Sequence, residues 1–253
     1  MFDEQPNRTT AVIELSFKQD AGFLNRISRL GGRLVPESRM PHWHSTGHAL
    51  LVRDPPGRRV LIVNSQKVQL QALSLRAITE KMADHLALFQ IVIDEFSLKS
   101  FDVASLRLMG SFDVGMSQHE LADLLFGTYF FERGHYSAIC DKPSDANLTL
   151  FGEKNDYSMD VFITPMTAEQ SLATFDGTAN LEHFADPKLF DPGLMEIRNS
   201  FDRDAFFVQV HLSKREISSL ALKSFFSGAL PLANQIATDA VKMVKKLPLR
   251  KSS

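Results

Sequence analysis

Residues His48–Ser65 read HALLVRDPPGRRVLIVNS, and this stretch decides the fold class. Two apolar runs, His48–Arg53 and Arg58–Ser65, flank the segment Asp54–Gly57. Proline presets φ for a turn and glycine tolerates positive φ, so this segment predicts a tight turn between two strands. We therefore expect an antiparallel hairpin with Gly57 in its turn.

Helical and extended patterns alternate on both sides of this hairpin. Before it, Thr9–Phe17 predicts a strand, and Asp20 begins a helix that should end at Gly31-Gly32, ahead of a loop over 33–47. After it, apolar residues at helical spacing predict a helix over Ala72–Phe89. Hairpins mixed with helices predict an α+β fold with antiparallel or mixed sheets that are covered by helices.

The remaining elements follow from the same signals. Strands are expected over Ile91–Phe96, Phe101–Val114 (with a bulge or bend at Gly110), Tyr136–Cys140, Asn147–Phe151, Tyr157–Thr164 and Ala205–Leu212. Capping boxes predict helices after Ser117, Thr167 and Ser213, the last of them broken at Gly228 and Pro231 before a final helix. Residues 176–204 are expected to form a loop. The order of strands and helices in the second half loosely resembles the order in the first half, which predicts two α+β halves, 1–131 and 132–253.

Four pieces of the first half carry a family resemblance. They are AVIELSF (Ala11–Phe17), the 48–65 hairpin, the 72–89 helix and LRLMG (Leu106–Gly110). In this order they resemble an uncharacterised, sporadically distributed bacterial family of α+β proteins of about this length. The family strand that carries arginine and glycine continues into an aromatic-Ile-Asn run, whereas Ser111-Phe112-Asp113 follows here. The resemblance implies a fold and a bacterial source, but no activity and no functional residues.

Composition limits the class of protein. Of the 253 residues, 44% are hydrophobic and 23% are charged, which is typical of globular chains and not of disordered ones. No apolar run approaches the roughly 20 residues of a membrane span, and the polar N-terminus is unlike a signal peptide. The single cysteine, Cys140, excludes a disulfide within the chain. We therefore expect a cytoplasmic protein without membrane contact.

His42, His44 and His48 form a histidine cluster. Residues two apart in an extended segment point the same way, so His42 and His44 would present two imidazoles to one ion, with His48 as a third ligand. Three nitrogens and a water suit catalytic zinc, which makes a metal-dependent enzyme one hypothesis. The alternative is that Trp43 anchors the segment and the histidines are polar loop residues, in which case no cofactor is expected.

Basic residues gather at two places. Arg53, Arg58 and Arg59 flank the hairpin turn, and Lys245 and Lys246 belong to a basic C-terminal tail. Such clusters neutralise phosphates, so a nucleic-acid-binding accessory protein is a second hypothesis. The alternative for the tail is a helix end whose lysines complement the helix dipole.

Arg107 lies inside the apolar strand Leu106–Met109. If its side chain is buried, it requires a carboxylate partner or a ligand, because an unpaired buried charge is very costly. The alternative is a solvent-facing residue of a half-exposed strand.

Phenylalanines recur in adjacent pairs, and the charge is divided between basic ends and an acidic middle. One ring of Phe206-Phe207 must point to each face of its strand, so both faces should be covered. Phe225, Phe226 and the following helix are expected to form an exposed apolar patch, which would mark an interface. The leading hypothesis is a non-enzymatic protein–protein interaction or assembly component of a bacterial multi-component system, with self-association expected.

Overall fold

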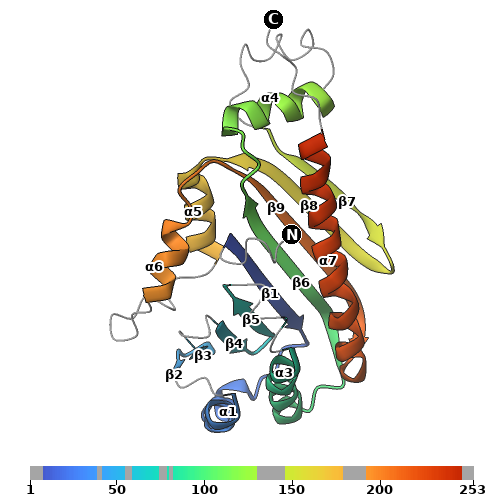
Figure 1. Cartoon of the computed structure of the whole chain (residues 1–253). Helices are drawn as coiled ribbons and strands as arrows, with labels where there is room; N and C mark the ends of the chain where they lie inside the picture. The colour runs from blue at the N-terminus through green and yellow to red at the C-terminus, as the bar shows by residue number, and fades with distance from the viewer. Residues whose placement is uncertain are drawn as a thin grey trace, which may run out of the picture.

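The computed structural model describes residues 8–38, 42–54, 59–73, 79, 82–129, 146–178 and 192–246. Their strands form one antiparallel sheet in the order β2-β3-β4-β5-β1-β6-β9-β8-β7 (Figure 1). The strands are β1 (Thr9–Ser16), β2 (His42–Ser45), β3 (Ala49–Asp54), β4 (Arg59–Asn64), β5 (Lys67–Ala72), β6 (Ser100–Phe112), β7 (Leu148–Lys154), β8 (Tyr157–Met166) and β9 (Ala205–Ser218). Helices pack on this sheet, which confirms the predicted α+β class.

The helices divide between the two faces of the sheet. The main core lies under α1 (Phe23–Ser38), α3 (Met82–Phe96), α4 (Gln118–Tyr129) and α7 (Leu222–Lys246). On the opposite face, which we call the outer face, α5 (Ala168–Thr178) and α6 (Pro192–Asn199) pack in a smaller cluster with Val60 and Leu73. Figure 1 shows α5 and α6 side by side, away from α7. None of the helices in the described ranges combines the length and apolarity that a membrane crossing requires.

The two halves of the chain repeat one plan. Each opens with a strand in the middle of the sheet, β1 or β6, continues through a helix and further strands, and ends in a helix on the main core. The two opening strands pair with each other from Thr9↔Gly110 to Ser16↔Val103. The predicted boundary after residue 131 falls between β6 and its partner β9 in the same sheet, and the division into 1–131 and 132–253 stays a prediction.

Alternation along β1 shows how the two faces differ. Ala11, Ile13 and Leu15 are fully buried in the main core, because side chains on a strand alternate between faces. Glu14 and Ser16 point to the outer face and are half-buried. The same sheet therefore has an apolar face under the helices and a partly polar outer face.

Several local predictions are confirmed. Strands β3 and β4 pair from Ala49↔Asn64 to Asp54↔Arg59, while Gly57 lies outside the described residues. The Ser117 backbone N–H donates to a Glu120 carboxylate oxygen at 2.8 Å, and the Glu120 N–H donates to the Ser117 hydroxyl at 3.3 Å, which is a capping box. The carboxylate accepts hydrogen bonds from the Ser117 N–H and, at 2.9 Å, from the Ser117 hydroxyl, and these two bonds, the backbone one first, hold the pKa of the Glu120 carboxyl below its ordinary value. A second box joins Thr167 and Gln170 at the start of α5.

The strand predicted over Ile91–Phe96 is wrong, because these residues belong to helix α3. Leu88, Val92 and Phe96 recur every four residues and are buried in the main core. This helical spacing outweighs the β-propensity of the Ile91-Val92-Ile93 run. The predicted bulge at Gly110 is also wrong, because Gly110 pairs with Val208 in the unbroken register of β6 and β9.

The predicted end of the first helix at Gly31-Gly32 is wrong, because α1 continues to Ser38. Strand β2 occupies part of the loop that was expected over 33–47. A Cβ on Gly31 would lie 3.5 Å from the Trp43 ring. This is an ordinary van der Waals distance, so α1 and the indole pack side by side at Gly31. Trp43 lies beside α1 but is 49% exposed, so its expected role as an anchor stays a prediction, and the histidines on either side of it belong to β2 rather than to a loop.

The helix predicted after Ser213 is wrong. Residues 213–218 continue β9, since Ser213 pairs with both Ser105 and Ser158 and Ile217 pairs with Phe101. α7 then runs from Leu222 to Lys246 without a break at Gly228 and with Pro231 inside it. Part of the loop expected over 176–204 is also helical, because α5 extends to Thr178 and α6 follows.

Candidate functional site

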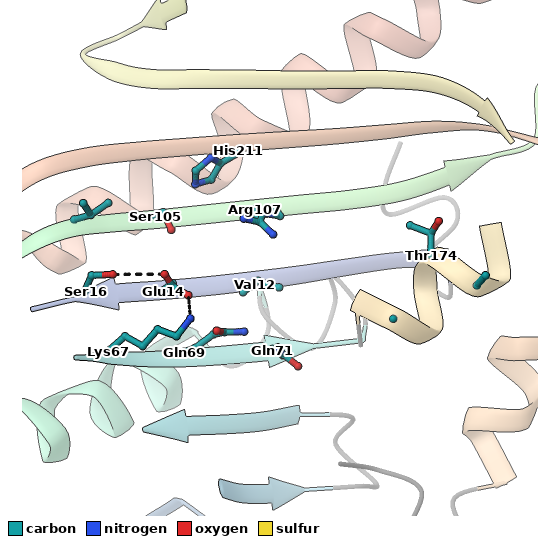
Figure 2. A pocket seen from close by; sticks show the side chains of 13 residues that line it. Val12, Glu14, Ser16, Lys67, Gln69, Gln71, Ser105, Arg107, Thr174 and His211 are labelled. Carbon is teal, nitrogen blue, oxygen red and sulfur yellow. Dashed lines mark hydrogen bonds and ion pairs between the residues drawn. The ribbon is translucent and has the colours of Figure 1, made fainter. Parts of the chain in front are cut away.

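A groove of ≈ 770 Å³ lies on the outer face, over the strands in the middle of the sheet (Figure 2). Residues of β5, β1, β6 and β9 form its floor, and Ala173, Thr174 and Gly177 of α5 form a wall. Sites for small molecules in proteins typically measure about 300–1,000 Å³, so this groove has the size of a ligand site.

One row of paired residues crosses the floor of the groove. Gln71 of β5 pairs with Val12 of β1, Val12 with Arg107 of β6, Arg107 with His211 of β9, and His211 with Asp160 of β8. Directly paired residues share a face of the sheet, so all five side chains point to the outer face. The register of strands far apart in sequence therefore assembles this row.

The charged side chains along the groove are paired, with Arg107 as the exception among the described residues. The Lys67 ammonium donates to Glu14 at 2.8 Å, and His211 Nδ1 lies 3.2 Å from Asp160 Oδ2. Arg107 is exposed and makes no hydrogen bond or ion pair with any residue of the described ranges. Its side chain is thus not buried, and its guanidinium lies on the floor of the groove with no partner in the part of the chain that the structure describes.

Gln71 adds an unusual polar group beneath the groove. Its side chain is 2% exposed, and its Oε1 atom is buried without a hydrogen-bond partner in the described part of the chain. Buried amide oxygens are normally hydrogen-bonded, so this unpaired acceptor at the edge of the groove lowers the stability of the folded protein.

The helix that forms the wall is held from both ends. The Thr167–Gln170 capping box fixes its start, and Phe175 packs on Phe201 with ring centroids 5.1 Å apart. Phe175 also belongs to the cluster that contains Val60 of β4. These contacts place Thr174 beside the floor strands.

The structure places His42 and His44 on one side of β2, opposite Arg53 and Leu51 of β3. His44 and His48 are exposed. Within the ranges that the structure describes, no three histidine, cysteine or acidic side chains are grouped as they would be around a metal ion. Zinc binding stays a prediction, and these histidines lie far from the groove, since His42 is five strands or about 24 Å from Arg107.

The basic hairpin patch is not formed as expected. Arg59 is 3% exposed and is ion-paired with Asp54 on the main-core side, with its Nη1 atom 3.2 Å from His85 Nε2. Arg53 pairs with Val60 and points to the outer face, so the two arginines lie on opposite faces. Arg58 lies outside the described residues. Lys245 and Lys246 are exposed in the last turn of α7, as the helix-end alternative predicts.

The exposed patch predicted at Phe225 and Phe226 is wrong. Both rings are buried in the protein's own core, with 3% and 1% exposure, because this face of α7 packs on the sheet. Phe226 stacks on Phe89 of α3 with ring centroids 6.0 Å apart. The prediction for Phe206 and Phe207 is confirmed, since the first lies in the main core and the second packs with Val12 and Met109 on the outer face.

Sequence reasoning found Arg107 and missed the residues around it. Glu14, Lys67 and His211 occur at alternate positions of apolar strands, and this pattern was the available signal. Which strands are neighbours cannot be read from such a pattern.

Comparisons with known proteins add no assignment. No protein-family model matches this chain, and no curated protein is similar to it in sequence. The family resemblance stays a prediction, and the function has to be argued from the groove.

Proposed function

We propose that this chain is a non-enzymatic binding component that holds a small organic acid in the groove, with the carboxylate of the acid on Arg107. The observation that carries this proposal is the lack of a partner for the Arg107 guanidinium among the described residues. Guanidinium forks bind carboxylates through two parallel hydrogen bonds, which are strong because both groups are charged.

The surroundings of Arg107 support an anion rather than a cation as the ligand. Two acidic side chains of the outer face are engaged, Glu14 by Lys67 and Asp160 by His211. The Glu14–Lys67 pair cancels its own charge, and the Asp160 carboxylate accepts the Nδ1 proton of a neutral His211, so the Arg107 guanidinium is the positive charge that lacks a partner among the described residues. Apolar lining for the body of the ligand comes from Ala173 of α5, while Val12 beside Arg107 is only 8% exposed.

The hypothesis of a cytoplasmic protein–protein interaction component is compatible with this function. A protein that senses a small acid acts through partners without performing chemistry itself. We retain this wider role as part of the proposal, but not the self-association through Phe225 and Phe226.

Titration with phenylpropanoate and with its neutral amide, phenylpropanamide, tests the proposal. We expect the acid to bind at least tenfold more tightly than the amide, because hydrogen bonds to a charged group contribute about 1.5–3 kcal/mol. Arg107→Gln should abolish this difference. Arg203→Gln, which changes an exposed arginine outside the groove, should preserve it. Equal binding of acid and amide to the unaltered protein would contradict the proposed function.

A further inference from the structure

We propose that His211 accepts a hydrogen bond from a hydroxyl group next to the ligand's carboxylate, so that the groove selects 2-hydroxy acids. This inference rests on the proposed function, since it requires the carboxylate to lie on Arg107. It goes further by assigning a second recognition residue and a class of ligand.

Asp160 determines which nitrogen of His211 faces the ligand. Its Oδ2 atom lies 3.2 Å from His211 Nδ1, and an ionised carboxylate accepts hydrogen bonds but cannot donate them. Nδ1 must therefore carry the proton, and in the neutral imidazole Nε2 is then an acceptor. Figure 2 shows the ring reaching from β9 toward β6, over the groove.

The spacing of Arg107 and His211 fits two adjacent groups of one small molecule. They are direct partners across β6 and β9, and Cα atoms of such partners lie about 4.5–5.5 Å apart. Because both side chains leave paired positions on the same face, a carboxylate held by Arg107 can place its neighbouring carbon beside the His211 ring. A hydroxyl on that carbon would donate to Nε2, while the carboxylate oxygens would accept from the guanidinium.

The charges around the pair favour a hydroxyl over an amino group. A 2-ammonium group would also donate to Nε2, but it would lie beside the positive charge of Arg107. Glu14 would attract it from the neighbouring strand, but the Lys67 ammonium already holds that carboxylate at 2.8 Å. A 2-hydroxy acid satisfies both residues without this repulsion.

Binding of phenyllactate, phenylpropanoate, phenylalanine and the methyl ether of phenyllactate tests the inference at pH 8, above the ordinary pKa of an imidazole. We expect phenyllactate to bind about five- to tenfold more tightly than phenylpropanoate, because one hydrogen bond to a partly buried acceptor is added. The methyl ether, which cannot donate, and phenylalanine should both lack this gain. In His211→Leu the gain should be lost, so that phenyllactate and phenylpropanoate bind this variant equally, and His211→Gln, which keeps an acceptor oxygen, should retain part of the gain.

The outcomes separate this inference from the proposed function. If phenyllactate and phenylpropanoate bind equally, or if the methyl ether binds as well as phenyllactate, the role of His211 is refuted while the Arg107 site stands. If none of the carboxylates binds, the proposed function fails and this inference fails with it. The methyl-ether comparison uses the unaltered protein, so it decides the question even if His211→Leu does not fold.

Discussion

The hydroxyl of Tyr157 occupies the space where a side chain at Gly228 would begin. A Cβ atom on residue 228 would lie 2.5 Å from the Tyr157 oxygen and 3.6 Å from the ring carbon that bears it. The same hydroxyl donates to the Phe225 carbonyl oxygen at 3.1 Å. Gly228 is therefore a point of close approach between α7 and β8, rather than the helix break that its residue type predicts.

Gly228→Ala should destabilise the protein by about 1–3 kcal/mol, because the anchored Tyr157 hydroxyl would have to move. In a Tyr157→Phe background the same change should be neutral or should stabilise by up to about 1 kcal/mol, since alanine is the better helix former. Urea unfolding of the four proteins of this cycle measures the coupling. Equal effects of Gly228→Ala in both backgrounds would refute the close contact.

Stability should fall at alkaline pH through Tyr157. Burial, and then the charge of Asp156, raise the pKa of the Tyr157 phenol above its ordinary value of 10.0. A group whose folded pKa is raised contributes stability that is complete below its unfolded pKa and is lost as pH rises through the folded pKa. Unfolding free energies measured from pH 8 upward should therefore decline beyond pH 10, and Tyr157→Phe should reduce the slope. An identical slope in the variant would contradict this account.

Pro231 lies inside α7 and is exposed. It cannot donate the backbone hydrogen bond to residue 227, so Pro231→Ala should stabilise the protein by about 1 kcal/mol or more. Thermal unfolding measures the change in melting temperature. Ala221→Gly, just before the helix, serves as a control that should lower the melting temperature. A lower melting temperature for Pro231→Ala would show that the proline fits its local geometry better than alanine.

Asp54 and Arg59 form a buried ion pair at the ends of β3 and β4. Asp54→Ala should cost about 3–5 kcal/mol, because it leaves a guanidinium buried without this carboxylate. The double replacement Asp54→Leu with Arg59→Met should cost much less, since no buried charge remains. Chemical unfolding of both variants makes the comparison, and a similar loss in the two would show that the charge of Arg59 is not the cause.

Local sequence signals predicted the structure correctly where the interacting residues are close together in the sequence. The Ser117–Glu120 and Thr167–Gln170 boxes were found because both members lie within one turn of helix. The similar Ser213–Glu216 pattern failed because pairing with β6 and β8 keeps that segment extended. Pairing with distant strands therefore overrides the capping-box motif at Ser213, although its sequence matches the motif as well as the two boxes that do begin helices.

The groove could be predicted only in part for the same reason. Arg107 was conspicuous within one apolar strand, but its neighbours Val12 and His211 come from strands about 95 and 104 positions away along the chain. β5, which supplies Lys67 and Gln71, was not predicted at all. Strand order and register, which no local pattern encodes, decide which side chains meet.

The measurement that tests the central claim most directly follows the Arg107 side chain itself. The Nε–H resonance of Arg107, assigned by its loss in Arg107→Gln, is recorded by NMR while phenylpropanoate is added. We predict a saturable downfield shift of this resonance, with the Arg203 resonance unchanged, because the carboxylate accepts its hydrogen bonds from the Arg107 guanidinium. An Arg107 resonance that stays in place while the acid binds elsewhere would contradict the account.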